Sequence, residues 1–279
     1  MWARNCAAAL VALAALAGCV RIPVSEQSLF LPRSSAGAPD FAGSAWTVED
    51  FFFTSWDGTP LNAVYLKQKG ALATVLFLGG NAFSLADSRG FAEIMMRHPV
   101  NLFMMDYRGY GRSGGTPTAA AFRADALAAY DALAARFGPN PRRIIVHGHS
   151  LGSFAATLVA SQRPVAALVL QNPATDGRDT LRYLVPWILR PFVRFDADPA
   201  LLADSNLERL RGVSVPTLVA GAGRDKVTSP RMARALYAAS PARTRRLVIG
   251  SRAGHNDLYL DPGFQAAYAE IVAIVSARR

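Results

Sequence analysis

Ser150 lies in a pattern of residues that could turn its hydroxyl into a nucleophile. It is the centre of Gly148-His149-Ser150-Leu151-Gly152, which follows the β-branched run 144–146 and precedes apolar residues at helical spacing. A tight turn between a buried strand and a helix strains the serine backbone and leaves no room for side chains at the two glycines. The helix N-terminus also favours developing negative charge. The pattern predicts nucleophilic catalysis; a plain glycine-rich turn is the alternative.

A serine nucleophile needs a base within hydrogen-bond reach, and His255 is the best candidate. The chain has four histidines, of which only His255 comes after Ser150 in the chain, in the polar loop 253–257 that follows a late strand. His98 lies between a helix and a strand, His147 is expected to end a strand, and His149 is expected to point away from the nucleophile. A histidine of an ordinary surface loop is the alternative for His255.

The acid that orients the base should lie between the serine and the histidine, after a strand. Asp225 fits, because the strand 217–220 is followed by the turn Gly221-Ala222-Gly223-Arg224-Asp225. A buried carboxylate there would hold the imidazole in one tautomer and stabilise the imidazolium that forms. Asp176, just past the preceding strand, is the second candidate. The remaining aspartates of this region are less suited: Asp196, Asp198 and Asp204.

Acyl transfer also needs donors for an oxyanion. The amide of Leu151 is placed for this by the turn itself. The second amide is expected from the loop 77–83, whose paired glycines allow close approach of a substrate to the backbone. We assign it to Asn81, with Ala82 as the alternative.

The elements that must position these residues alternate regularly. Runs rich in β-branched and apolar residues predict strands at 48–55, 61–67, 74–78, 101–105, 143–147, 167–170, 216–220 and 246–249. Helical patterns lie at 85–97, 118–137, 151–162, 229–239 and 264–277. Such alternation predicts an α/β fold, a mostly parallel sheet with helices on both faces. The candidate residues all follow strand ends, where active sites of such sheets lie.

One segment, about 174–208, is longer than a single crossover helix requires. Its middle is crowded with apolar and aromatic residues and is interrupted by Pro186 and Pro191. We expect a small cap over the site, suited to an acyl chain or a membrane surface. The alternative is that these residues only cover the edge of the sheet.

The N-terminus has the pattern of an export signal. Arg4 precedes an apolar run at 7–17 that is too short to span a bilayer. The run ends in Leu16-Ala17-Gly18-Cys19, which resembles the lipobox of bacterial lipoproteins and implies cleavage after residue 18 and acylation of Cys19. Val20 after the cysteine then implies the outer membrane, facing the periplasm. A plain secretory signal is the alternative. Residues 19–45, with several prolines, glycines and serines, are expected to be a linker before a domain at 46–279.

The composition narrows the class of partner. The formal net charge is +10, but the arginines are scattered and form no basic stripe interleaved with aromatics. We therefore expect no nucleic-acid partner; an anionic membrane surface is a better use of this charge. No metal-ligand spacing such as His-Glu-x-x-His occurs. We expect no metal or organic cofactor.

Taken together, the motifs resemble one family. The run Asp106-Tyr107-Arg108-Gly109-Tyr110-Gly111-Arg112-Ser113, the serine turn, the Gly-x-x-Asp turn and Gly-His-Asn-Asp look like the Bem46-like α/β-hydrolases, which include the ABHD13 and ABHD17 types. The resemblance covers about 46–279 and departs at Gly79, where the family has histidine. It implies the triad Ser150, Asp225 and His255 and the cleavage of ester or thioester bonds of an acyl, lipid-like or small-molecule substrate. A binding protein without catalysis and an amidase or peptidase of the same fold are the alternatives.

Overall fold

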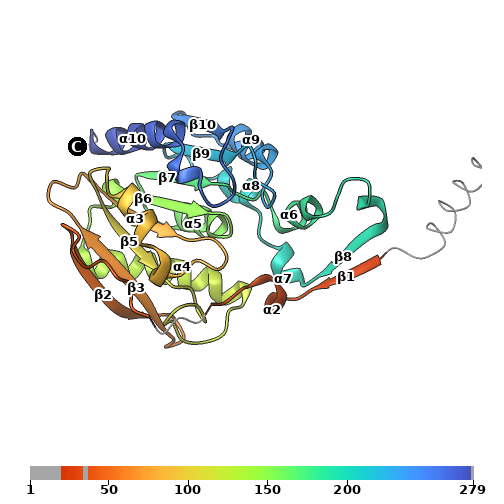
Figure 1. Cartoon of the computed structure of the whole chain (residues 1–279), viewed down its shortest axis with the longest axis horizontal. Helices are drawn as coiled ribbons and strands as arrows, with labels where there is room; N and C mark the ends of the chain where they lie inside the picture. Colours follow the sequence, from red (N-terminus) through yellow and green to blue (C-terminus); the bar gives the residue numbers. More distant parts are fainter. Residues whose placement is uncertain (1–19, 34–36, 278–279) are drawn as a thin grey trace, which may run out of the picture.

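A central sheet of eight strands organises the protein, whose computed structural model describes residues 20–33 and 37–277 (Figure 1). The strand order is β10-β9-β7-β6-β4-β5-β3-β2. The first six of these strands run parallel, whereas β3 pairs antiparallel with β5 and with β2. The strand bounds are β2 (Thr47–Thr54), β3 (Pro60–Lys67), β4 (Ala73–Leu78), β5 (Val100–Met105), β6 (Ile144–His149), β7 (Ala167–Gln171), β9 (Thr217–Ala222) and β10 (Arg245–Gly250).

Helices cover both faces of this sheet, as the alternating pattern predicts. One face packs against α4 (Ala119–Phe137), α5 (Gly152–Gln162), α8 (Asn206–Leu210) and α9 (Pro230–Ala239). The other packs against α3 (Arg89–Met95) and α10 (Pro262–Ser276), near the 3₁₀ turns η1 (Leu85–Asp87) and η4 (Leu258–Leu260). Successive residues of a strand alternate between the two cores: Leu76 and Leu78 face one, Val75 and Phe77 the other. The short turn η2 (Pro141–Arg143) leads into β6.

The predicted α/β fold is confirmed, and each expected strand and helix is present with ends shifted by a few residues at most. The expected helix 85–97 is split into η1 and α3. Strand β6 continues through His149, two residues beyond its expected end. That extension brings the serine turn directly to the carboxyl edge of the sheet.

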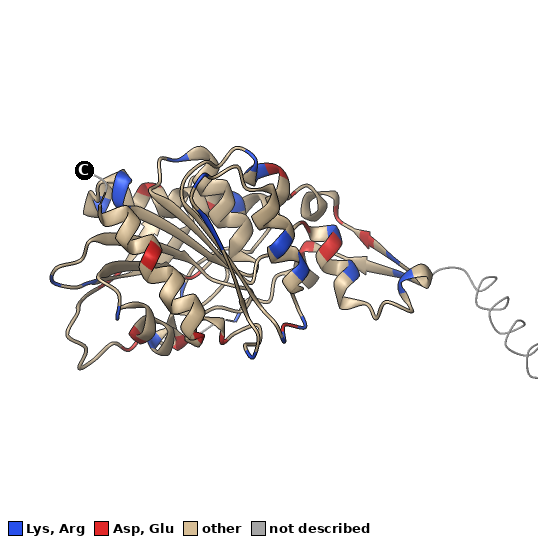
Figure 2. Ribbon diagram, turned by 90° about the horizontal axis from the view of Figure 1, so that it is seen from above, with Lys and Arg blue, Asp and Glu red and all other residues tan. Residues whose placement is uncertain are grey.

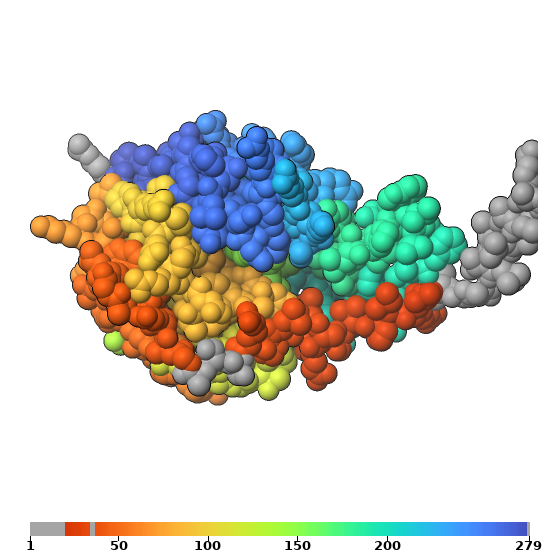
Figure 3. Space-filling view, viewed as in Figure 1, coloured from red at the N-terminus to blue at the C-terminus, as the bar shows by residue number. Residues whose placement is uncertain are grey.

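The structure corrects the expectation of a linker at 19–45. Strand β1 (Val20–Val24) pairs in parallel with β8 (Val193–Ala197), and α2 (Glu26–Leu29) follows it. Phe30 and Phe41 are buried in the two cores of the domain. In Figure 3 this N-terminal segment runs from the outer end of the teal arm back along it to the body. The pairing joins residues about 170 positions apart, so no local pattern reveals it.

The expected insertion forms most of an arm that projects from one end of the body (Figures 1 and 2). It comprises α6 (Gly177–Leu184), η3 (Arg190–Phe192), β8 and α7 (Pro199–Leu202), and β1 completes it. We call these elements, with the residues between α6 and η3, the arm. Its base contacts the candidate site, as shown below.

The predicted signal peptide 1–18 and the candidate lipidation residue Cys19 lie outside the described residues. In the part of the chain that is described, no helix has the length and apolar character needed to cross a membrane.

Candidate active site

The turn between β6 and α5 holds Ser150 as its pattern predicts. Its φ is +53°, a left-handed conformation that is strained for a residue with a side chain. A Cβ at Gly152 would lie 2.0 Å from the carbonyl oxygen of Leu78, and one at Gly148 would lie 2.4 Å from that of Gly152. Both glycines are therefore required by close backbone packing. The amide of Ser150 donates to the carbonyl of Gln171, which ties the turn to β7.

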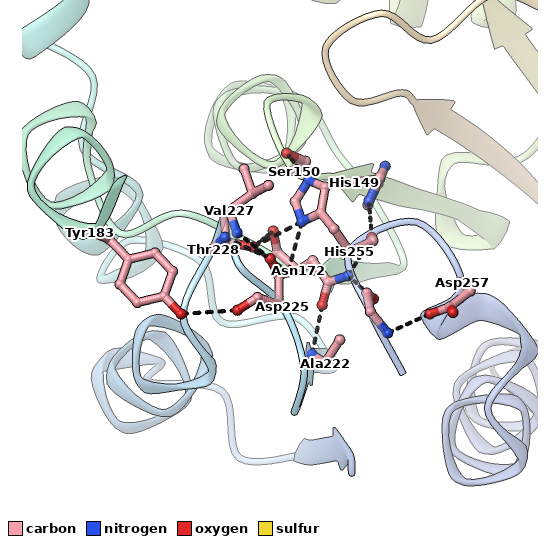
Figure 4. Close-up of polar contacts among 11 residues, drawn as sticks. His149, Ser150, Asn172, Tyr183, Ala222, Asp225, Val227, Thr228, His255 and Asp257 are labelled. Carbon is pink, nitrogen blue, oxygen red and sulfur yellow. Dashed lines mark hydrogen bonds and ion pairs between the residues drawn. The ribbon is translucent and has the colours of Figure 1, made fainter. Parts of the chain in front are cut away.

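Ser150, His255 and Asp225 form a continuous line of hydrogen bonds (Figure 4). The Oγ of Ser150 is 2.9 Å from Nε2 of His255, and Nδ1 of His255 is 2.7 Å from Oδ2 of Asp225. With Nδ1 donating to the carboxylate, Nε2 is free to accept the serine proton. Thus the structure brings the three residues selected from the sequence within reach of one another, although they lie up to 105 positions apart.

The Asp225 carboxylate is fully enclosed and well supplied with donors. Burial acts to raise its pKa, but the hydrogen bond with His255 and its charge, together with the amides of Thr228 and Val227, lower the pKa below its usual value. The hydroxyl of Thr228 also donates to Oδ2, at 2.8 Å. Tyr183 of α6 donates to the Asp225 carbonyl, so the arm contacts the turn that carries the acid. The carboxylate stays ionised and fixes the tautomer of the base.

Two residues, Asn172 and His149, hold the loop of His255 by hydrogen bonds to its backbone. The sequence analysis did not predict this role for either of them. Asn172, with a φ of +46°, donates through its amide to the carbonyl of His255 at 2.7 Å and accepts from the amide of Ala222. His149 donates from Nε2 to the same carbonyl, at 2.9 Å. Burial and the nearby His255 lower the pKa of His149 to about 4, so it is neutral. The only sequence signal was the position of Asn172 at a strand end.

The loop after β4 lies against the serine. A Cβ at Gly80 would approach the Cβ of Ser150 to 3.3 Å, and Asn81 and Leu151 line the same cavity as Ser150. The side chain of Asn81 is fully engaged: it donates to the Leu29 carbonyl and accepts from Leu31 and Tyr110. The oxyanion role expected for the backbone amides of Asn81 and Leu151 stays a prediction. Ala82, the alternative to Asn81, has a φ of +62°.

Residues of the motif 106–113 hold the loop after β4 and the turn that follows it. The hydroxyl of Tyr107 donates to the carbonyl of Gly79, and Asp106 accepts from the amide of Leu85. The family histidine has no room at Gly79, because a Cβ there would lie 2.3 Å from the ring of Phe83. The departure from the family pattern therefore matches a different local packing.

A cavity of about 630 Å³ opens beside Ser150 and His255. Its wall is mostly apolar and comes from regions far apart in the sequence: β1 and α2, α4, α5, α6 and α7. Its apolar contributors include Ile22, Leu29, Phe122, Phe154, Leu181 and Leu184. The N-terminal residues belong to the segment expected to be a linker, so their presence in this wall was not foreseen. The base of the expected cap does line the site.

The other candidates lie elsewhere. Asp176 caps α6 by accepting from the amide of Asp179 and is not bonded to His255. His98 bonds Gln265, far from the serine, and His147 lies among aromatic rings behind β6 with its Nε2 on Gln171. Within the described ranges, no group of three histidine, cysteine, aspartate or glutamate side chains gathers as a metal site would require.

Comparisons with known proteins agree with this geometry. Residues 70–200 match the family model of the serine aminopeptidases, S33. An uncharacterised protein of Mycobacterium tuberculosis is 32% identical over 252 residues, which is 89% of this chain and 87% of that protein. The human α/β-hydrolase domain-containing protein 17C is 32% identical over 215 residues, 76% of this chain and 62% of that protein.

Solved structures show the same fold. An esterase from Pyrococcus furiosus superposes with a TM-score of 0.70 at 20% identity, covering 87% of this chain and 98% of that one. An acetyl xylan esterase from Paenibacillus superposes with a TM-score of 0.66 at 17% identity, covering 85% and 86%. The parallel sheet, the strained serine at the end of β6 and these relatives together show that the chain belongs to the α/β-hydrolase family.

Proposed function

We propose that this hydrolase cleaves carboxylic ester or thioester bonds through the triad of Ser150, His255 and Asp225. The observation that carries the proposal is the hydrogen-bonded line from Ser150 to Asp225, placed at the wall of an apolar cavity. A serine hydroxyl activated in this way attacks acyl carbonyls, and the cavity offers a place for the acyl chain.

The proposed reaction proceeds in two halves. The Oγ of Ser150 attacks the acyl carbonyl while Nε2 of His255 takes its proton, and Asp225 stabilises the imidazolium. The amides of Leu151 and Asn81 bind the oxyanion. The imidazolium then protonates the leaving alcohol or thiol, which departs and leaves an acyl-enzyme. Water attacks that intermediate with His255 again as base, and Ser150 is regenerated.

The cavity supports an acyl substrate better than a peptide with a free N-terminus, although the matching family model carries an aminopeptidase name. A substrate ammonium needs an unpaired carboxylate near the serine. Of the described residues that line the cavity, Asp204 is the only acidic one, and it is paired with both Arg123 and Arg209. We therefore place the amidase or peptidase activity second.

Covalent labelling with a fluorophosphonate probe tests the activated serine. We expect wild-type protein to be labelled and Ser150→Ala to be silent. Ser161→Ala is the matched control, since its hydroxyl only bonds a carbonyl one turn back in α5. A folded wild-type protein that resists labelling would instead point to a binding protein on the same scaffold.

The leaving group is tested separately with p-nitrophenyl esters of increasing acyl length, the matching acyl thioesters and aminoacyl p-nitroanilides. We expect turnover of the first two classes, with kcat/KM rising as the chain fills the apolar cavity. Turnover of the anilides alone would establish a peptidase and overturn the ester proposal.

We further propose that Cys19 is acylated and anchors the enzyme to the outer membrane of a bacterial envelope, facing the periplasm. The support is the Leu16-Ala17-Gly18-Cys19 pattern and the apolar run before it. Mass spectrometry of the N-terminal peptide should find acyl groups on Cys19 and none in Cys19→Ser. Membrane fractionation then tests the location.

A further inference from the structure

The arm carries the densest group of exposed apolar side chains in the described part of the chain. Residues 184–192 hold five of its fourteen exposed large hydrophobics: Leu184, Trp187, Ile188, Leu189 and Phe192. Trp187 is 76% exposed, more than any other of the fourteen. Trp187, Ile188 and Leu189 are absent from the wall of the catalytic cavity and from that of the second cavity described below. We call residues 184–192 the tip.

Positive charge surrounds the tip without acidic partners. Residues 180–195 include three arginines and no aspartate or glutamate. A second cavity of about 370 Å³ is bordered by four arginines, Arg178, Arg182, Arg190 and Arg194, over an apolar floor. In the described ranges none of the four forms an ion pair; Arg190 donates only to the carbonyl of Val185. Figure 2 shows basic positions on the arm, together with some acidic ones.

The two strands of the arm also place like charges together. In the parallel pair β1·β8, Arg21 is directly opposite Arg194. Adjacent like charges on one face of a sheet are destabilising unless an anion lies between or beside them. Strand β1 also lies next to the candidate lipid anchor in the chain, because it begins at the residue after Cys19. The arm therefore starts where the candidate anchor ends.

We propose that the tip and its arginines form a docking surface for an anionic phospholipid bilayer. Trp187, Ile188 and Leu189 enter the interface between headgroups and acyl chains, where indole rings are favoured. Arg182, Arg190 and Arg194 bind the headgroup phosphates, for which the guanidinium fork is well shaped. A second copy of the chain is a poorer occupant, since it would bring arginines against arginines.

The proposed docking surface lies next to the catalytic cavity. Leu181 and Leu202 line both the arginine-bordered cavity and the catalytic cavity. The docking surface and the proposed acyl site therefore share a wall. Docking does not require catalysis, and we expect Ser150→Ala to dock like the wild-type protein.

A fluorescent label at the tip tests the contact. In the full chain with Cys6→Ser and Cys19→Ser, Ile188→Cys is labelled with an environment-sensitive dye. The apolar run 7–17 is present in all variants, so a difference between variants reports on the changed positions and not on that run. Leu72→Cys, an exposed position just before β4, is the control site.

We expect the label at position 188 to shift to the blue with phosphatidylcholine vesicles that contain phosphatidylglycerol, and to be quenched by spin-labelled lipid. The label at position 72 should do neither. Changing Arg182, Arg190 and Arg194 to glutamine should lower the apparent affinity for these vesicles, taken from the lipid titration of the shift, about a hundredfold. The matched triple Arg97→Gln, Arg234→Gln and Arg243→Gln removes the same charge elsewhere and should change it less than about threefold.

Three results would overturn the proposal. In the first, the label at position 188 shows no blue shift with vesicles. In the second, its shift is the same with phosphatidylcholine alone as with phosphatidylglycerol present, and the same in the arginine variant as in the protein with its arginines. In the third, the label is shielded without vesicles while the protein runs as a dimer, which would assign the tip to a contact between copies. Thermal unfolding of each variant separates these outcomes from misfolding.

Discussion

The loops at the carboxyl edge of the sheet and the arm differ in how their side chains are satisfied. At the edge, the polar groups are buried and paired: Asp225 receives three donors besides His255, and the carbonyl of His255 receives two. In the arm, apolar side chains face solvent and arginines lack carboxylates. A set of paired buried groups fixes geometry, which catalysis needs. A surface of exposed apolar side chains and unpaired arginines indicates a binding partner outside the chain, such as a membrane or another protein.

The strongest test of this contrast changes one aspartate in each region. We expect Asp225→Asn to lower kcat about 10⁴-fold, since the amide no longer fixes the tautomer of His255. Asp176→Asn, at the base of the arm, keeps the N-cap of α6 and should retain activity within about twofold. Steady-state kinetics on the best ester measures both. Equal losses would mean that Asp225 is not the acid.

A smaller effect is expected for the support of the His255 loop. Asn172→Gly keeps the positive φ but loses the three hydrogen bonds of the carboxamide, to the carbonyls of Gly254 and His255 and from the amide of Ala222. We expect kcat to fall about 10- to 100-fold with little change in KM, because the base is displaced and the cavity is not. A rise in KM alone would show that Asn172 acts on substrate binding instead.

Acid should lower the stability of the folded protein, because His147 of β6 is buried. Burial lowers the pKa of His147 to about 3, while an unfolded histidine titrates near 6.5. On acidification the unfolded state gains its proton first, so this contribution to stability is complete above pH 6.5 and is lost as the pH falls toward 3. We expect the free energy of unfolding to fall by about 1.4 kcal/mol per pH unit for each such histidine.

Urea unfolding between pH 7 and pH 5 measures that slope. His147→Leu should reduce it, whereas His98→Leu should reduce it less, since that ring is only half-buried. Identical slopes in wild type and His147→Leu would contradict the assignment.

The smallest effect on stability is expected at the tip. Trp187→Ser should change the free energy of unfolding by less than about 0.5 kcal/mol, because the ring is already in water. Leu168→Ala in β7, by contrast, empties a fully buried site and should cost about 2–5 kcal/mol. Thermal or urea unfolding compares them. A large loss at Trp187 would show that the tip packs within the protein.

Much of the fold followed from local pattern. The alternation of strands and helices and the glycine spacing around Ser150 predicted the parallel sheet and the serine turn, because both depend on near neighbours. The order Ser150, Asp225, His255 also selected three residues that the structure brings together. These features are local, or follow from where strands end.

Other features were decided only by tertiary contacts. The pairing of β1 with β8, the bonds of Asn81 to residues 29 and 31, and the support of His255 by Asn172 and His149 all join segments far apart in sequence. No periodicity records such contacts, since hydrophobic pattern states whether a residue is buried and not against what. The sequence by itself determined the sheet and the candidate nucleophile. The tertiary structure decided that the supposed linker forms a cavity wall and one edge of the arm.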